Sequence, residues 1–470
     1  MNYKKQSLLL FIITILFWSC DKWVEGYDDD PNSSPEVSID NLFTASQVNI
    51  FNFAENHLAR TVAIWMQQMA GTDRQYKTLG LYSYEENDYA ASWMSVYING
   101  GLKDLRFIQS IADDDKSPQG KPYKGMAQVL EAFLIGSASS VWGAIPYSEA
   151  LDESIINPIL DDQALVYLSV QSLLNSAIDN LASDTTLLPQ NDMFFEGDIE
   201  KWKAVAYTLK ARYYMHWVEK VNGETDIPNC NSALENAEHG ITSLDGTMKT
   251  LHGTESSEQN IWYQFDFSRA GYMAAGANLV DLLKRNSDPR DSIYFEYTTG
   301  TDVVNGAKPG ESYNNHSYLN DKYFGADASI DIVSYEENLL IQAECKYRLG
   351  ELGEAKTFLE LAQLAAEEKW GVTIPDISGE ISDNDLWDKI LEEKYIALFL
   401  NIEIWNDYKR NCYPDVKYKK SEDDDGNPIY VSPPVRVYYP EDERKTNTSI
   451  PNITSQPLFN DNDPAQCTSE

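Results

Sequence analysis

The feature that most constrains the fold of this chain is the helical spacing of apolar residues in three long stretches. Spacings of three and four positions place such residues on one face of a helix. The stretches are residues 51–69, with Phe51, Ala54, Leu58, Val62, Trp65 and Met69; residues 202–217, with Trp202, Val205, Leu209, Tyr213 and Trp217; and residues 391–405, with Leu391, Tyr395, Leu398, Ile402 and Trp405. Asp198 precedes the second stretch as a plausible N-cap. The sequence therefore predicts a mainly α-helical protein.

A pair of adjacent helices is predicted over residues 338–366. The first helix ends at Gly350, which suits a left-handed C-cap, and the second begins a few residues later. The small residues Ala343 and Ala355 let the two helices approach closely. The segment resembles a tetratricopeptide-type helix pair, and residues 233–244 are a candidate to close another. Such pairs bury their faces on one another and form a scaffold.

Three long segments with little helical period interrupt this pattern, at residues 71–92, 250–276 and 298–330. They are rich in Gly, Asn, Ser and Tyr, and long loops of a compact protein often carry function. Residues 418–433 indicate two short extended pieces joined at Asp425 and Gly426. We expect residues 39–470 to form a single helical domain whose inserted loops carry a ligand face.

The N-terminus has the pattern of a secretory signal. Lys4 and Lys5 precede an apolar run from Leu8 to Trp18, which would rise only about 16 Å as a helix and is too short to cross a membrane. The run ends at Cys20, and the segment resembles a bacterial lipoprotein signal, in which the cysteine takes lipid. We predict a signal peptide over residues 1–19, lipid attachment at Cys20 and a flexible tether over residues 20–38. The alternative is a plain secreted protein with a chance cysteine.

Charge and aromatic content limit the partners of the chain. Seventy-four acidic and 37 basic residues give a net charge of −37. Because nucleic-acid binding rewards a basic surface, this balance argues against such a partner. The chain has 29 Tyr, 16 Phe and 11 Trp residues. Some belong to the core, but so many Tyr and Trp also suit a surface that binds flat, amphipathic ligands.

The cysteines that follow Cys20 are Cys230, Cys345, Cys412 and Cys467. Four thiols allow three disulfide pairings, and the sequence does not choose among them. No CxxC motif occurs, which argues against a clustered metal or redox site.

No catalytic constellation is present in the sequence. The five histidines are scattered without an HExxH motif, and the chain has no GxSxG motif and no phosphate-binding loop. Glu344 and Glu403 lie in predicted helices beside aromatic residues. We expect them to be buried partners of arginine, with Arg212, Arg410 and Arg436 as candidates. The sequence predicts no enzyme activity, no metal and no cofactor. A glycan-degrading enzyme that uses paired carboxylates is the alternative.

Five segments in order resemble the SusD/RagB family of nutrient-binding lipoproteins of Bacteroidetes. They are "VWGAIPYSEAL" (141–151), "KWKAVAYTLKARYYM" (201–215), "SYEENLLIQAECKYRLG" (334–350), "ILEEKYIALFLNIEIWNDYKRNCYP" (390–414) and "VRVYYPEDERKTN" (435–447). The resemblance is closest to the branch with the Pro-Tyr-Ser-Glu turn. It implies tetratricopeptide-like helix pairs with loops that make a ligand face. It also implies an outer-membrane lipoprotein that faces the cell exterior and delivers oligosaccharides to a SusC-like TonB-dependent transporter.

A sugar-binding surface needs an exposed aromatic ring flanked by hydrogen-bonding side chains, because a pyranose has an apolar face and a rim of hydroxyls. Three loop segments offer this combination: residues 72–88, 257–273 and 311–323. We predict ligand contacts by Trp262 first, then by Tyr263, Tyr76 and Tyr84, with Arg74 and Tyr313. Each ring has the alternative of packing under its own loop. A peptide ligand, or a scaffold that contacts only the transporter, remains open.

Overall fold

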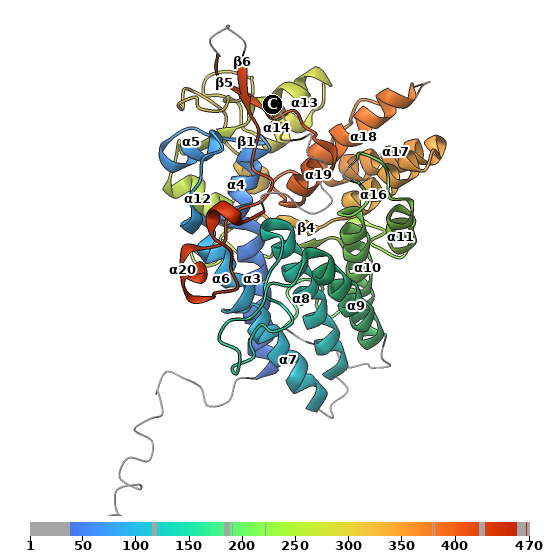
Figure 1. Cartoon of the computed structure of the whole chain (residues 1–470). Helices are drawn as coiled ribbons and strands as arrows, with labels where there is room; N and C mark the ends of the chain where they lie inside the picture. Colours follow the sequence, from blue (N-terminus) through green and yellow to red (C-terminus); the bar gives the residue numbers. More distant parts are fainter. Residues whose placement is uncertain are drawn as a thin grey trace, which may run out of the picture.

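The computed structural model describes residues 38–114, 120–182, 189, 191–220, 222–377, 379, 381–422, 428–457 and 467. Within these residues the protein is built mainly from helices, as predicted (Figure 1). Cys20, the signal peptide and nearly all of the predicted tether lie outside them.

The helices of the first half are α3 (Ile39–Glu55), α4 (His57–Trp65), α5 (Arg74–Gly80), α6 (Ala90–Tyr97), α7 (Leu102–Asp114), α8 (Gly120–Trp142), α9 (Gln163–Leu181), α10 (Ile199–Met215) and α11 (Ile227–Ala237). Those of the second half are α12 (Ile261–Ser268), α13 (Ala277–Arg285), α14 (Arg290–Tyr294), α15 (Asp321–Phe324), α16 (Tyr335–Arg348), α17 (Leu352–Trp370), α18 (Asp383–Ala397), α19 (Glu403–Asn411) and α20 (Glu441–Thr446).

Within the described ranges, six short strands form antiparallel pairs between these helices. They are β1 (Met69–Gly71) with β3 (Met273–Ala275), β2 (Met248–Lys249) with β4 (Asp331–Val333), and β5 (Tyr418–Glu422) with β6 (Pro428–Val431). The last pair confirms the two extended pieces expected near the C-terminus, and the predicted turn between them lies outside the described residues.

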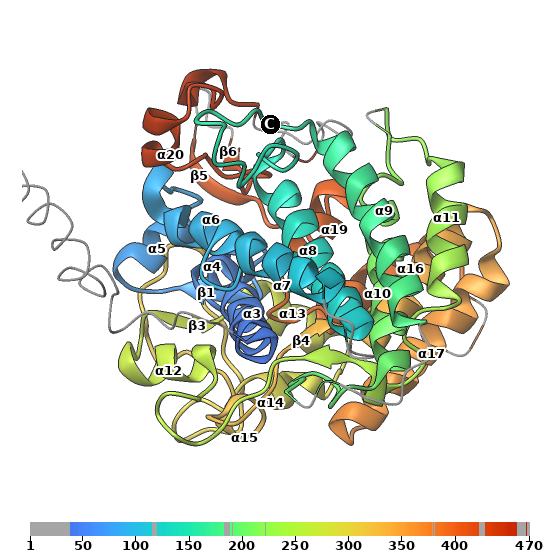
Figure 2. The same ribbon diagram turned by 90° about the horizontal axis from the view of Figure 1, so that it is seen from below.

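Helix pairs stack along one side of the molecule, where α9, α10, α11, α16 and α17 lie together (Figure 2). The pair predicted over residues 338–366 is confirmed as α16 and α17, and Gly350 between them has a φ of +80°. Asp198 caps α10 as predicted, since its side chain accepts from the backbone N–H groups of Glu200 and Lys201. The packing of α10 against α11 supplies a second pair.

The helix α8 is buried almost along its whole length. Gly136 lets α8 meet α10 closely, because a Cβ there would lie 2.3 Å from Cζ of Tyr213. The hydroxyl of Tyr213 donates across this contact to the carbonyl of Phe133, at 3.0 Å.

Two of the long predicted helices are each divided into two. The first breaks at Asn56, whose side chain caps the start of α4 by accepting from the backbone N–H of His57 at 2.9 Å. The other breaks between α18 and α19, where Leu400 has a φ of +64° and Asn401 accepts from the backbone N–H of Glu403. Local capping by asparagine outcompetes continuation of the helix at both places, although the apolar period runs on.

Among the four cysteines that the structure describes, Cys412 and Cys467 form a disulfide, whereas Cys230 and Cys345 are buried free thiols. The structure thus selects one bridge where the sequence left the pairing open. No helix within the described ranges is long and apolar enough to cross a membrane.

Candidate functional site

The three predicted loop segments meet at one surface, which we call the loop face and define as residues 72–82, 261–272 and 308–318. The β1–β3 ladder joins the first two, with Gly71 opposite Met273. Beyond the ladder, Thr72 donates from its backbone N–H to the carbonyl of Tyr272 at 2.9 Å. The third segment is tied on by Lys77, whose ammonium donates to the hydroxyl of Ser312 at 2.8 Å.

Gly71 makes this assembly sterically feasible. A Cβ at that position would lie 1.8 Å from the carbonyl oxygen of Tyr76, so a larger residue would push α5 away from β1. The chain therefore turns back tightly after β1 and presents α5 on the loop face.

Two groups of rings on the loop face reach solvent. Tyr313 is 39% exposed and stacks on Tyr318, with ring centroids 5.2 Å apart and planes inclined by 24°. On α12, Phe267 is 80% exposed and stacks on the half-buried Tyr263 at 6.2 Å and 19°. Each pair gives a flat aromatic platform of the kind that an apolar sugar face can cover.

Hydrogen-bonding groups flank these platforms. The Arg74 side chain is exposed and lies over the ring of Tyr272, with Cζ 5.6 Å from the ring centroid. Tyr313 lies beside Gly271, next in the chain to Tyr272. Within the part of the chain that the structure describes, the side-chain amides of Gln75 and Asn314 are exposed and form no hydrogen bond. The loop face thus offers rings together with free donors and acceptors.

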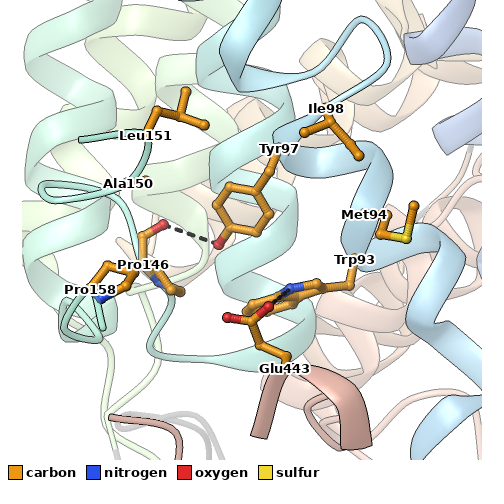
Figure 3. Close-up of a pocket in the computed structure, with 9 residues that line it drawn as sticks. All are labelled: Trp93, Met94, Tyr97, Ile98, Pro146, Ala150, Leu151, Pro158 and Glu443. Carbon is orange, nitrogen blue, oxygen red and sulfur yellow. Dashed lines mark hydrogen bonds between the residues drawn. The ribbon is translucent and has the colours of Figure 1, made fainter. Parts of the chain in front are cut away.

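A second surface is an apolar pocket of about 270 Å³ between α6, α20 and the segment 146–158 (Figure 3). Trp93 donates from Nε1 to Oε2 of Glu443 at 3.4 Å, and Tyr97 donates from its hydroxyl to the carbonyl of Pro146 at 3.0 Å. The exposed side chains of Met94 and Leu151 border it. The indole N–H of Trp93 and the hydroxyl of Tyr97 thus already have hydrogen-bond partners. The pocket therefore suits an apolar side chain better than a sugar.

Comparison with known proteins bears on what such surfaces do. A SusD-like family model, described as "Starch-binding associating with outer membrane", matches residues 31–440. The chain belongs to the SusD-like family. The family resemblance drawn from the five sequence segments is thereby confirmed, and no curated protein sequence matches this SusD-like protein.

Solved structures share the fold of this SusD-like protein at low sequence identity. A SusD/RagB family protein from Bacteroides thetaiotaomicron is 20% identical with a TM-score of 0.71, over 88% of this chain and 95% of that one. A chitin-binding protein is 23% identical with a TM-score of 0.71, over 87% and 94% of the two chains. A chitin-binding SusD homolog from Flavobacterium johnsoniae is 18% identical with a TM-score of 0.70, over 92% and 99%. These structures confirm the predicted helical fold.

The prediction that the rings of Trp262 and Tyr76 are exposed is wrong. Trp262 is 0% exposed because it lies on the inward face of α12, one turn from the buried Phe265. Tyr76 is 2% exposed, and its hydroxyl accepts from Nε of Arg60 at 3.0 Å and contacts Nδ1 of His57 at 3.2 Å. Burial, assisted by the charge of Arg60, lowers the pKa of His57 to about 4, so this support for Tyr76 is uncharged at neutral pH.

Tyr84 lies apart from the loop face. Its ring stacks on Tyr438 at 5.0 Å, and its hydroxyl donates to the carbonyl of Arg436 at 3.0 Å, so it anchors the C-terminal segment. Of the other predicted residues, Arg74, Tyr263 and Tyr313 do lie on the loop face. Phe267 was missed, although its spacing of four from Tyr263 places both rings on the outward face of α12.

The helix carboxylates are held in buried ion pairs, as expected. Glu344 pairs with Arg410 at 2.6 Å and Arg348 at 3.0 Å, and also contacts Lys394. Burial opposes the ionisation of Glu344, but these cations outweigh it and hold its pKa well below the ordinary value.

Glu403 is also buried, and it pairs with His216 at 2.6 Å and lies 3.8 Å from Arg212. Burial opposes its ionisation, but His216 and Arg212 lower its pKa to about 2. Arg436, the third candidate, is not among the ion-pair partners of Glu344 and Glu403 and donates to the carbonyl of Pro457. Among the described residues, no three metal-ligating side chains gather at one point.

Proposed function

We propose that this SusD-like protein captures oligosaccharides on the loop face at the outer membrane and delivers them to a SusC-like TonB-dependent transporter. The observation that carries the proposal is the combination on the loop face of two stacked, solvent-reaching ring pairs with Arg74, Gln75 and Asn314 at their margins. Supporting it, the family description names starch binding and the outer membrane, and two structural neighbours are chitin-binding proteins.

The proposal assigns ring stacking to Tyr313, Phe267 and Tyr263, and hydrogen bonding to Arg74. Trp262 and Tyr76 support the face from beneath. Trp262 is buried in the first turn of α12, and Tyr76 packs its ring 4.8 Å from that of Phe265. No residue is proposed to act as a catalyst. The face would gain affinity by ring contact and by hydrogen bonds to sugar hydroxyls, and both require only a preformed surface.

Calorimetric titration of the full chain with starch fragments, chito-oligosaccharides, other glycans and peptides tests the proposal. We expect saturable binding of at least one glycan and about a tenfold loss of affinity in each of Tyr313→Ala and Phe267→Ala. The matched control is Phe107→Ala, which removes an exposed ring from α7 at the other end of the molecule (Figure 1). We expect this control to bind like the wild type.

Other outcomes would overturn the proposal in different ways. Saturable binding of peptides alone would keep capture but replace the substrate class. Co-purification with a transporter, without affinity for any glycan or peptide, would identify a scaffold. Release of shorter glycans from a polysaccharide, lost on replacing one carboxylate, would identify an enzyme.

A further inference from the structure

A polar groove of about 520 Å³ adjoins the loop face, between α13, residues 308–309 and β5. In Figure 1, α13 and β5 lie at the same end of the molecule. Its volume is within the range of small-ligand sites. The groove is continuous with the loop face, because the hydroxyl of Tyr418 donates to the carbonyl of Leu81 at 3.0 Å and Leu81 closely approaches Gly310.

The charge of the groove is opposite to that of the chain. Acidic residues outnumber basic ones by two to one in the whole sequence, at 74 to 37. The groove is nevertheless lined by Arg285, Lys308, Lys417 and Lys419 and by one acid, Asp281. Because the surrounding surface repels anions, a local group of four cations is where an anionic ligand would gain most.

Three cations of the groove, Arg285, Lys308 and Lys419, are available to a ligand. Arg285 contacts Glu392 at 3.3 Å with its side chain 65% exposed, and Lys419 pairs with Glu422 at 2.5 Å on the same solvent-facing strand. Exposed pairs of this kind contribute little and exchange readily. Lys308 is exposed, and within the described residues its ammonium forms no ion pair.

We propose that this groove binds an acidic sugar unit, a uronate or a sulfate ester, of a glycan whose neutral part lies on the loop face. The half-buried ring of Tyr418 supplies a flat contact for the sugar, and the cations pair with its carboxylate or sulfate. This inference rests on the proposed capture of glycans and names the substrate class.

Calorimetric titration of the full chain, purified in detergent, compares three oligosaccharide classes. Oligogalacturonates supply carboxylates, carrageenan oligosaccharides supply sulfates without carboxylates, and chito- and malto-oligosaccharides are neutral. We expect at least one acidic class to bind more tightly than the neutral ones. Its affinity should fall about tenfold in each of Lys308→Glu and Lys419→Glu, and also as salt rises from about 0.05 M to about 0.5 M. Tighter binding of oligogalacturonates would identify a carboxylate as the ligand group, and tighter binding of carrageenan oligosaccharides would identify a sulfate.

The matched control is Lys103→Glu, which reverses an exposed charge on α7, far from the groove. If acidic glycans bind no more tightly than neutral ones, or if Lys103→Glu weakens them as much as Lys308→Glu does, the inference is overturned while capture stands. Tight binding of acidic peptides in place of acidic glycans would also overturn it. If no glycan of any class binds, the proposed function is overturned as well.

Discussion

Asp266 lies on α12, in the loop face, and within the described residues it forms no ion pair. Burial, with the charge of Asp321 nearby, raises the pKa of the Asp266 carboxyl from its ordinary value near 4 to about 7. The folded protein therefore holds the Asp266 proton more tightly than the unfolded chain does, so the stability of the protein falls as pH rises from about 4 to about 7.

Asp266→Asn should remove this pH dependence, because an amide does not titrate. We expect the variant to be more stable than the wild type by about 4 kcal/mol above pH 7, with the difference vanishing below about pH 4. Urea unfolding at a series of pH values measures it. Ser268→Ala on the same helix is the control and should shift stability equally at every pH. A difference for Asp266→Asn that grows toward low pH would contradict the assignment.

At single positions the sequence could indicate which residue types make a binding surface but not which way they face. The period on α12 separates Trp262 and Phe265 from Tyr263 and Phe267, yet eight residues do not reveal which pair is inward. The larger ring, that of Trp262, lies in the core, because burying a tryptophan removes the most apolar surface from water. Trp262, ranked first among the predicted ligand contacts, is therefore buried in the core.

Three helices are joined by ion pairs at Glu344. This residue of α16 pairs with Lys394 on α18 and with Arg410 on α19. Glu344→Gln removes the anion that three buried cations share and leaves them, among the described residues, only Asp407 and Glu219 as acidic partners. We expect a loss of about 3 kcal/mol in the free energy of unfolding. Chemical denaturation measures this loss. Glu354→Gln removes an exposed partner of Lys346 and should cost under about 1 kcal/mol. Equal losses in the two variants would contradict the role given to Glu344.

The Cys412–Cys467 disulfide ties the end of α19 to the C-terminal segment. We expect the double variant Cys412→Ala, Cys467→Ala to lose about 3 kcal/mol in urea unfolding, since the bridge restricts the unfolded chain. Alkylation of the unfolded, unreduced chain should modify the two free thiols, Cys230 and Cys345. Modification of Cys412 or Cys467 without reductant would contradict the bridge.

Helices were more predictable than their ends. The pair α16 and α17 followed from Gly350 and the apolar period, because a stop signal and a strong pattern agreed there. The break at Leu400 gave no comparable signal. It depends on Asn401, whose side chain also donates to the carbonyl of Asp331, a partner seventy residues away that a local pattern does not reveal.

At the scale of the whole molecule, the proposed attachment through Cys20 determines where the protein resides. We expect the wild type to fractionate with the outer membrane and to incorporate a labelled fatty acid, and Cys20→Ser to do neither. Cys230→Ser, which changes a buried thiol of the folded domain, is the control and should keep the label. Labelling of Cys20→Ser would place the lipid elsewhere.

The family and the helical class were predictable from the whole chain, because five short segments occur in the same order as in the family and the family model spans residues 31–440. The loop face was predictable only as three separate segments. Their union depends on the β1–β3 register, and strands of three residues carry too little pattern to fix a partner two hundred positions away.

That register also determines when the loop face can form. Because Ala70 pairs with Ala274, the surface forms only after both the first helices and the middle of the chain have folded, and such distant contacts close late. A nascent chain that ends before residue 318 therefore lacks the complete surface. Conversely, a ligand that contacts both regions holds them together. By mass action it raises the free energy needed to open the domain. Ligand occupancy and resistance to unfolding should thus rise together in this protein.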